Sequence, residues 1–129
     1  MYATDETTAG EILAVIGLGY VGLPLAVAFA QHGPVIGYDI DAERLANLEA
    51  GFDPNGEVDS AALKRSKQNL RFTSRADALR VARIYIVTVP TPVDETNRPD
   101  LGALQDASRS IAAFLKKGDL VIYESTVYP

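Results

Sequence analysis

The sequence predicts an α/β domain of the Rossmann type, a doubly wound parallel sheet. Short apolar runs alternate with segments of helical spacing, and this alternation is typical of parallel strands joined by helices. The first apolar run leads into a glycine turn that opens a helix, and the second ends on an aspartate. Right-handed crossovers favour the strand order 3-2-1-4-5, with a site at the carboxyl ends of strands one and four, where the order reverses.

The glycine turn follows the apolar run 12–16 and places glycines at positions 17, 19 and 22. In a G-x-G-x-x-G pattern, Gly17 allows a tight turn off the strand, and Gly19 allows a pyrophosphate to approach the backbone. Gly22 allows the helix to pack close to the strand. That helix presents unpaired N–H groups and the positive end of its dipole to the phosphates.

An aspartate at the end of the second apolar run strengthens this interpretation. Asp39 lies 20 residues beyond Gly19, where a carboxylate accepts hydrogen bonds from the ribose hydroxyls of an adenosine. The alternative is a glycine-rich turn of another α/β fold, in which Asp39 only caps the following helix.

Residues 12–30 contain no charge, and this run of 19 residues is long enough to cross a bilayer. Three glycines and Pro24 interrupt it, and no Lys or Arg precedes Arg44 to orient it, so we expect no membrane span. No secretory pattern precedes the first strand, and a cytoplasmic setting is the simplest interpretation.

Turn and capping residues divide the rest of the chain. Residues 1–10 show no periodicity and are expected to form a disordered leader. Loops are expected at 52–59 and 90–99, which are rich in Pro, Gly, Asn and Asp. The expected helices are 21–31, 41–51, 60–68, 74–81 and 100–117, and the later strands are 35–39, 70–73, 84–89 and 120–123. The expected helix caps are Asp41, Ser60, Ser74 and Asp100.

The composition fits one soluble domain of 129 residues, with 47% hydrophobic and 22% charged residues. The chain has no Cys, which excludes disulfides and a Cys-based zinc site, and its single His32 cannot form a metal cluster by itself. The net charge of −5 argues against nucleic acid as a partner.

Charge is unevenly distributed along the chain. Residues 1–60 hold ten acids and one base, whereas residues 64–83 hold seven bases and one acid. A solvated face of two short helices is the favoured interpretation of the basic segment. A docking surface for an acidic partner, or for another part of the protein, is the alternative.

Four motifs occur in a fixed order in this chain. They are Ile-Gly-Leu-Gly-Tyr-Val-Gly-Leu-Pro at 16–24, Tyr-Asp-Ile-Asp at 38–41, Thr-Val-Pro-Thr-Pro-Val-Asp at 88–94 and Glu-Ser-Thr-Val-Tyr-Pro at 124–129. With them, residues 11–129 resemble the N-terminal NAD-binding domain of the UDP-glucose/GDP-mannose dehydrogenase family. The last motif is most similar to bacterial UDP-N-acetylhexosamine (GlcNAc, GalNAc or ManNAc) 6-dehydrogenases of surface-polysaccharide synthesis.

The resemblance implies NAD as the cofactor and indicates which residues contact it. The glycine turn and Asp39 match the pyrophosphate and ribose contacts, and Arg44 matches a basic position near the adenosine; a surface helix residue is the alternative for Arg44. Residues 89–91 match a loop beside the adenine and ribose. The expected cofactor-binding residues are Gly17, Gly19, Tyr20, Val21, Gly22, Asp39, Arg44, Val89, Pro90, Thr91, Ser125 and Thr126.

The resemblance also implies a reaction, in which the sugar C6 alcohol is oxidised to a carboxylate in two hydride transfers through a covalent thiohemiacetal on a cysteine. That cysteine is absent from this chain. Thr126 matches a threonine that assists by positioning water or substrate, although its hydroxyl could instead bind backbone. The expectation is therefore a fragment of a longer enzyme, truncated before the last strand or strands of its sheet and inactive alone.

The implied partners are a nucleotide-sugar substrate, bound through a missing sugar-binding domain, and a second copy of the full-length protein in a homodimer. A stand-alone dinucleotide-binding regulatory module is the competing function, because a fold does not decide function.

Overall fold

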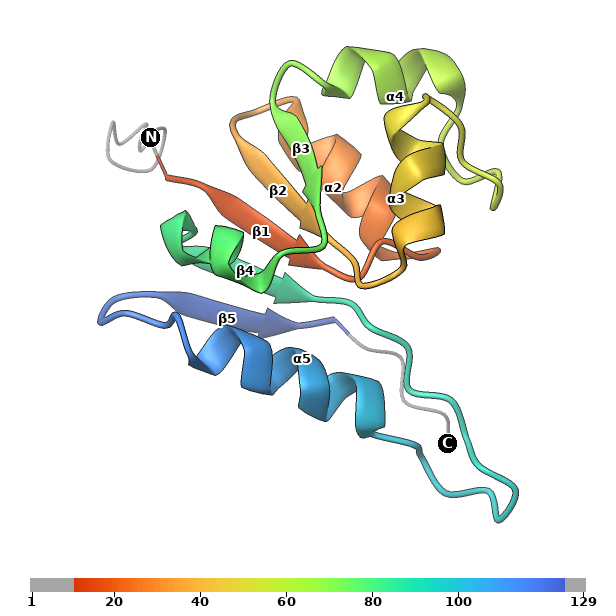
Figure 1. The fold of residues 1–129 in the computed structure, drawn as a ribbon, viewed down its shortest axis with the longest axis vertical. Helices are drawn as coiled ribbons and strands as arrows, with labels where there is room; N and C mark the ends of the chain where they lie inside the picture. The colour runs from red at the N-terminus through yellow and green to blue at the C-terminus, as the bar shows by residue number, and fades with distance from the viewer. Residues whose placement is uncertain (1–10, 125–129) are drawn as a thin grey trace.

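The computed structural model describes residues 11–124. The predicted disordered leader, 1–10, lies outside the described residues. Ten elements follow one another along the chain (Figure 1). They are β1 (Leu13–Ile16), α2 (Gly22–Ala30), β2 (Val35–Tyr38), α3 (Ala42–Glu49), α4 (Ser60–Ser66), β3 (Leu70–Thr73), the 3₁₀ helix η1 (Ala76–Val81), β4 (Ile84–Val87), α5 (Gly102–Ala112) and β5 (Leu120–Tyr123).

The five strands form one parallel sheet in the order β3-β2-β1-β4-β5, which confirms the expected order. Ile16, the last residue of β1, pairs with Tyr38 on one side and Val87 on the other. The three central strands therefore end level. Their carboxyl ends meet where the order reverses between β1 and β4, which is where ligands bind in open α/β sheets.

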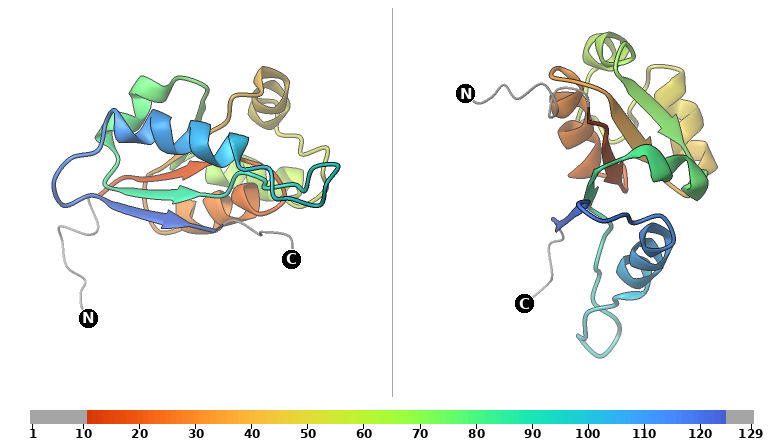
Figure 2. Two further views of the ribbon diagram at one scale, coloured as in Figure 1. Left: turned by 90° about the horizontal axis from the view of Figure 1, so that it is seen from below. Right: turned by 90° about the vertical axis from the view of Figure 1, so that its left-hand side faces the viewer.

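Consecutive residues of β1 point to opposite faces of the sheet and enter two separate cores. Val15 packs with apolar residues of α2, α3 and α4, whereas Ala14 and Ile16 pack with residues of η1 and α5. Figure 2 shows α2 and α5 on opposite faces. The uncharged run 12–30 is thus a buried strand, a turn and a nine-residue helix. No helix within residues 11–124 has the length and apolarity needed to cross a membrane.

The caps of α3 and α4 show where short-range signals succeed and fail. Asp41 caps α3 as predicted, because its Oδ1 accepts hydrogen bonds from the N–H groups of Glu43 and Arg44. The predicted cap of α4 is wrong by one residue. Asp59 rather than Ser60 precedes the helix, and its carboxylate accepts the N–H of Ala62 at 2.8 Å.

The predicted helix 74–81 is instead the 3₁₀ helix η1, and Ser74 is not its cap. Thr73 takes over the turn, because its hydroxyl accepts the N–H of Arg75 at 3.0 Å. The N–H of Ala78 then bonds to the carbonyl three residues earlier. Such i to i+3 bonding is usual in short connectors, where no further turns exist to favour α-helical bonding.

Helix α5 ends at Ala112, five residues before the predicted end at 117. Lys116 makes tertiary contacts instead of closing the helix, since its Nζ donates to the carbonyls of Arg80 and Ala82. Lys116 therefore joins the segment after α5 to η1. The predicted cap of α5 is wrong by one residue, because Leu101 rather than Asp100 precedes the helix. The carboxylate of Asp100 nevertheless accepts the N–H of Gly102 at 2.9 Å.

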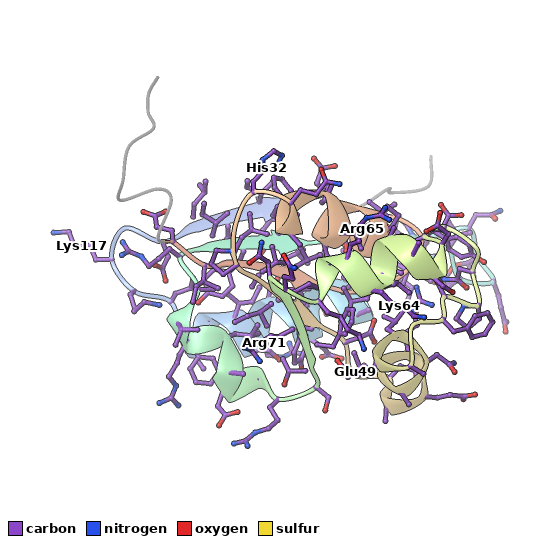
Figure 3. All side chains as sticks on the ribbon, turned by 90° about the horizontal axis from the view of Figure 1, so that it is seen from above. His32, Glu49, Lys64, Arg65, Arg71 and Lys117 are labelled. Carbon is purple, nitrogen blue, oxygen red and sulfur yellow. The ribbon has the colours of Figure 1, made fainter. Side chains whose placement is uncertain are left out.

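The seven basic residues of segment 64–83 are distributed over α4, β3, η1 and their flanks. Arg75 pairs with Asp77 at 2.7 Å, and Arg83 pairs with Asp119 at 2.9 Å. The positive charge of the segment is therefore partly compensated within the chain. The other five form no ion pair with any described residue: Lys64, Arg65, Lys67, Arg71 and Arg80, of which Lys64, Arg65 and Arg71 are labelled in Figure 3.

Helix α2 packs against the end of β1 more closely than any side chain would allow. A Cβ at Gly22 would lie 1.7 Å from the carbonyl oxygen of Gly17 and 2.4 Å from Oγ1 of Thr88. Only glycine permits this approach, so Gly22 fixes the distance between the helix and the sheet.

We expect Gly22→Ala to lower the free energy of unfolding by about 3 kcal/mol, because a backbone carbonyl cannot move aside without shifting the helix. Urea denaturation measures the change. Gly33→Ala is the matched control, since a Cβ there has no neighbour within 4 Å. Equal stabilities for the two variants would contradict the close contact at Gly22.

Candidate cofactor site

A cleft of about 700 Å³ lies at the carboxyl ends of β1, β2 and β4 and extends to the first two turns of α5. The glycine turn, the end of β2, the start of α3 and the start of the loop after β4 contribute to its walls. Its lining residues are Ile16, Gly17, Leu18, Gly19, Tyr38, Asp39, Ile40, Asp41, Arg44, Asn55, Thr88, Val89, Pro90, Asp100, Gly102, Ala103, Asp106, Ala107 and Ser110.

The glycine turn leaves room for a ligand at one position only. Gly17 has a φ of +97°, which disfavours any side chain, and a Cβ there would contact the backbone of residues 88 and 89 at 3.2 Å. A Cβ at Gly19 would meet nothing within 4 Å. No side chain caps the first turn of α2. Pro24 has no N–H, and that of Leu23 donates to the carbonyl of Gly19 at 3.2 Å, which leaves the N–H of Gly22 for an anion beside Gly19.

Thr88 holds this turn in place and was missed by the sequence analysis. Its buried Oγ1 lies 2.6 Å from the carbonyl oxygen of Gly17 and 3.1 Å from that of Ile16. Its own N–H donates to the carbonyl of Ile16 at 2.8 Å. The hydroxyl therefore ties the end of β4 to the glycine turn. A polar residue closing an otherwise apolar strand was the available signal.

Asp39 joins the turn to the start of α3. Its Oδ2 accepts the N–H of Leu18 at 2.9 Å, and its Oδ1 accepts the N–H of Asp41 at 3.0 Å. Each carboxylate oxygen has a second lone pair, and the residue lines the cleft. The carboxylate is thus fixed in position and keeps the capacity to accept two vicinal hydroxyls.

Arg44 also lines the cleft, and two hydrogen bonds fix its guanidinium. Its Nε donates to the carbonyl of Leu18 at 2.8 Å, and its Nη1 donates to Oδ1 of Asp53 at 2.7 Å. Its side chain is only 11% exposed, and that of Asp53 is fully buried. The surface-residue alternative for Arg44 does not describe this side chain.

Asp53 is a second residue that the sequence analysis missed. Beyond Arg44, its carboxylate accepts the backbone N–H groups of Asn55, Glu57 and Val58 at 2.9–3.0 Å. Burial opposes the ionisation of Asp53, but the hydrogen bond from Arg44 and those from the three backbone N–H groups outweigh burial and hold its pKa below the ordinary value. Asp-Pro-Asn-Gly indicates a turn in the sequence, whereas the contact with Arg44 is tertiary and leaves no local signal.

The other predicted site residues are divided between the cleft and its surroundings. Val89 and Pro90 line the cleft, but the side chains around it do not include Tyr20, Val21 or Thr91. Of these three, Thr91 is buried, whereas Tyr20 is 66% exposed and Val21 is 47% exposed. The remaining two, Ser125 and Thr126, lie outside the described residues.

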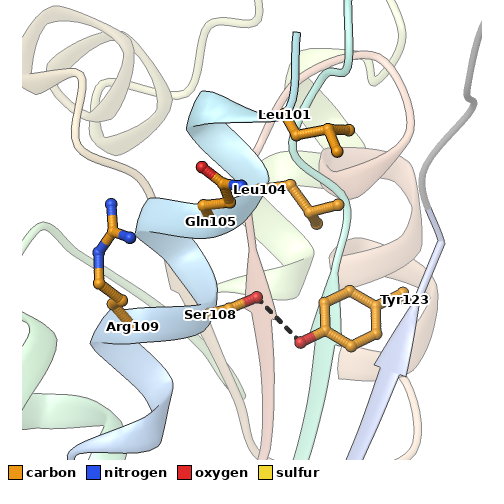
Figure 4. Close-up of a pocket in the computed structure, with 6 residues that line it drawn as sticks. All are labelled: Leu101, Leu104, Gln105, Ser108, Arg109 and Tyr123. Carbon is orange, nitrogen blue, oxygen red and sulfur yellow. Dashed lines mark hydrogen bonds between the residues drawn. The ribbon is translucent and has the colours of Figure 1, made fainter. Parts of the chain in front are cut away.

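A second hollow, of about 530 Å³, lies between α5 and β5 (Figure 4). Its lining residues are Leu101, Leu104, Gln105, Ser108, Arg109 and Tyr123. The hydroxyls of Ser108 and Tyr123 hydrogen-bond to each other at 2.9 Å, and Arg109 pairs with Asp106. The hydroxyls of Ser108 and Tyr123 are thus engaged with each other, and the glycine turn does not reach this hollow. The cleft at the strand ends is therefore the candidate site.

The fold and the cleft define a class of protein. A parallel sheet of order 3-2-1-4-5, a glycine turn with open space at its second glycine, and an aspartate fixed at the end of β2 are the features of a Rossmann-type dinucleotide-binding domain. Residues 11–129 match the NAD binding domain of the UDP-glucose/GDP-mannose dehydrogenase family. The chain belongs to this family, which confirms the resemblance seen in its motifs.

Named relatives support the same assignment. The chain is 55% identical over 117 residues to UDP-N-acetyl-D-glucosamine 6-dehydrogenase of Pseudomonas aeruginosa, a match covering 91% of this chain and 28% of that protein. The solved UDP-D-ManNAc dehydrogenase of Pyrococcus horikoshii superposes with a TM-score of 0.82 at 36% identity, over 92% of this chain and 29% of that one. Cap5O of Staphylococcus aureus, a UDP-N-acetyl-mannosamine dehydrogenase, gives a TM-score of 0.77 at 32% identity, over 92% of this chain and 30% of that one.

The chain thus spans less than a third of the length of these relatives. The cofactor of the family domain is NAD, and the residues of the cleft fit it. Open space at Gly19 suits a pyrophosphate, and the oxygens of Asp39 suit the ribose hydroxyls.

Gly19→Val tests whether the turn binds the pyrophosphate. The new side chain has space in the free protein but fills the position of the pyrophosphate, so we expect NAD to bind roughly 100-fold more weakly while the fold is retained. Calorimetric titration measures binding, and circular dichroism measures folding. Gly33→Val is the matched control, at a site equally open but at the other end of α2. Normal NAD binding by Gly19→Val would show that the turn has a structural role only.

Proposed function

We propose that this chain is the NAD-binding part of a UDP-sugar 6-dehydrogenase, which oxidises the C6 alcohol of a nucleotide sugar to a carboxylate for surface-polysaccharide synthesis. The observation that carries the proposal is the cleft, with its open glycine turn and fixed Asp39. Relatives named as UDP-N-acetyl-D-glucosamine and UDP-N-acetyl-D-mannosamine dehydrogenases supply the substrate class.

Each part of the site has a role in this proposal. The backbone around Gly17 and Gly19 and the first turn of α2 bind the pyrophosphate, with Tyr20, Val21 and Gly22 supplying the backbone of that turn. Asp39 accepts the adenosine ribose hydroxyls, and Arg44 lies near the adenosine, with its guanidinium bonded to Leu18 and Asp53. Bound NAD supplies the hydride acceptor. The segment Val89, Pro90 and Thr91 flanks the adenine and ribose. By resemblance to the family, Ser125 and Thr126 are also proposed to bind the cofactor, with Thr126 assigned to the nicotinamide end.

The rest of the reaction needs groups outside this chain. The chain contains no Cys, so the covalent step implied by the family requires a nucleophile from elsewhere in a longer protein. In the proposal a further domain holds the nucleotide sugar, two copies of the full-length protein form a homodimer, and the enzyme acts in the cytoplasm. Thr126 assists by positioning water or substrate.

We expect the chain to bind NAD at least about 10-fold more tightly than NADP. Asp39 would face the 2′-phosphate of NADP with like charge and would lose its hydroxyl partner. Calorimetric titration with both cofactors measures the preference, and Asp39→Asn, which removes the charge, should reduce it. Tighter binding of NADP by the unaltered chain would contradict the assigned role of Asp39.

We also expect the chain alone to oxidise no nucleotide sugar. A covalent mechanism requires an activated nucleophile, and hydride transfer requires the substrate to be held at roughly 3–3.5 Å from the acceptor. The assay mixes the purified chain and NAD with a panel of UDP- and GDP-sugars and follows NADH by its absorbance. Sustained turnover with any sugar would overturn the proposed division of the enzyme.

A further inference from the structure

We propose that Asp53 is a positioning residue that sets the choice between NAD and NADP by holding Arg44 away from the 2′ position of the adenosine ribose. The inference rests on the proposed binding of NAD in the cleft. Asp53 lies in the loop after α3, apart from both the glycine turn and Asp39.

Arg44 is the only Lys or Arg among the residues lining the cleft. An arginine near the end of β2 accommodates the 2′-phosphate in NADP-binding relatives of this fold, because a guanidinium matches the geometry of a phosphate. Arg44 therefore has the chemistry to reverse the preference imposed by Asp39. What decides the preference is where its guanidinium is held.

The guanidinium is held against protein groups on two sides. Nε bonds to the carbonyl of Leu18, and Nη1 forms an ion pair with Asp53. The third nitrogen, Nη2, is buried from solvent and has no hydrogen-bond partner in the described part of the chain. In this conformation a phosphate in the cleft cannot reach Nη2, and Arg44 has to leave Asp53 before it can bind one.

Leaving Asp53 is unfavourable because its carboxylate is fully buried. Without Arg44, the carboxylate would keep its backbone donors, the N–H groups of Asn55, Glu57 and Val58, but would lose its counterion. A buried charge without its partner is strongly destabilising. The lowered pKa of Asp53 keeps it ionised near neutral pH, so the pair persists under the conditions in which a cofactor binds.

The consequence is an electrostatic asymmetry at the ribose. The charge of Arg44 is neutralised by Asp53, whereas Asp39 has no ion pair among the described residues. Asp39 bonds instead to two backbone N–H groups. A 2′-phosphate would therefore meet negative charge without an available cation. Removing the carboxylate of Asp53 should release Arg44 toward the cleft.

The test compares NAD with NADP, and 5′-AMP with adenosine 2′,5′-bisphosphate, by calorimetric titration of the purified chain and of Asp53→Asn. Two affinity ratios are measured, that of NADP to NAD and that of adenosine 2′,5′-bisphosphate to 5′-AMP. We expect Asp53→Asn to raise both by about 10-fold, the size of one gained charge-assisted hydrogen bond. Glu57→Gln is the matched control. It removes the same charge from the same loop at an exposed side chain and should leave both ratios unchanged.

The double variant Asp53→Asn/Arg44→Gln separates release of Arg44 from simple loss of negative charge. We expect the gain to disappear in it, whereas a gain that persists would overturn the proposal. An unchanged ratio in folded Asp53→Asn, as judged by circular dichroism, would overturn it equally. Failure of the unaltered chain to bind NAD at all would instead contradict the proposed function.

If Asp53→Asn does not fold, the single variant Arg44→Gln, which keeps Asp53, tests the proposal instead. Because the proposal keeps Arg44 away from the 2′-phosphate, the ratio between adenosine 2′,5′-bisphosphate and 5′-AMP should stay within about twofold of its original value. A selective loss of the bisphosphate would show that Arg44 already engages the 2′-phosphate, and the proposed role of Asp53 would be wrong.

Discussion

The backbone of Leu18, in the middle of the glycine turn, is held from three directions, and the shape of the cleft depends on these contacts. Its N–H donates to Asp39 at the end of β2, and its carbonyl accepts Nε of Arg44 in α3. Its side chain is fully buried in the core beneath. Hydrogen bonds to charged groups are stronger than those between neutral groups. The turn is therefore fixed relative to both the carboxylate of Asp39 and the guanidinium of Arg44.

Close packing at the other end of the turn complements these polar contacts. Gly22 lets α2 approach the carbonyl of Gly17. The hydroxyl of Thr88, just after β4, donates a hydrogen bond to the same carbonyl. Between these constraints, Gly19 is left with open space. The backbone that is proposed to meet the pyrophosphate is thus fixed before the ligand arrives, and a prearranged site loses less conformational freedom on binding than a mobile one.

Much of this arrangement was predictable because it follows from signals close together in the sequence. Alternating apolar runs gave the correct strand order, and the spacing of the glycines to Asp39 located the cleft. The contact of Asp53 with Arg44 was not predictable, since it depends on how the loop after α3 folds back. The predicted end of α5 was wrong for a similar reason, because Lys116 donates hydrogen bonds to the carbonyls of Arg80 and Ala82, which are distant in sequence.

The cleft has one side formed by the ends of β1, β2 and β4 and another formed by α5. The two sides differ in how firmly the core supports them. Residues of β1 and β4 beneath the turn are almost fully buried, whereas in the edge strand β5 the side chains of Leu120 and Tyr123 are each 52% exposed. In this chain taken alone β5 is an edge strand. Local opening requires least free energy where few apolar contacts are lost, so in the chain alone α5 and β5 are easier to displace than the side that carries Asp39. In the proposed binding mode, discrimination at the adenosine therefore depends on the firmly packed side. It does not require the α5 side of the cleft to be fixed in place.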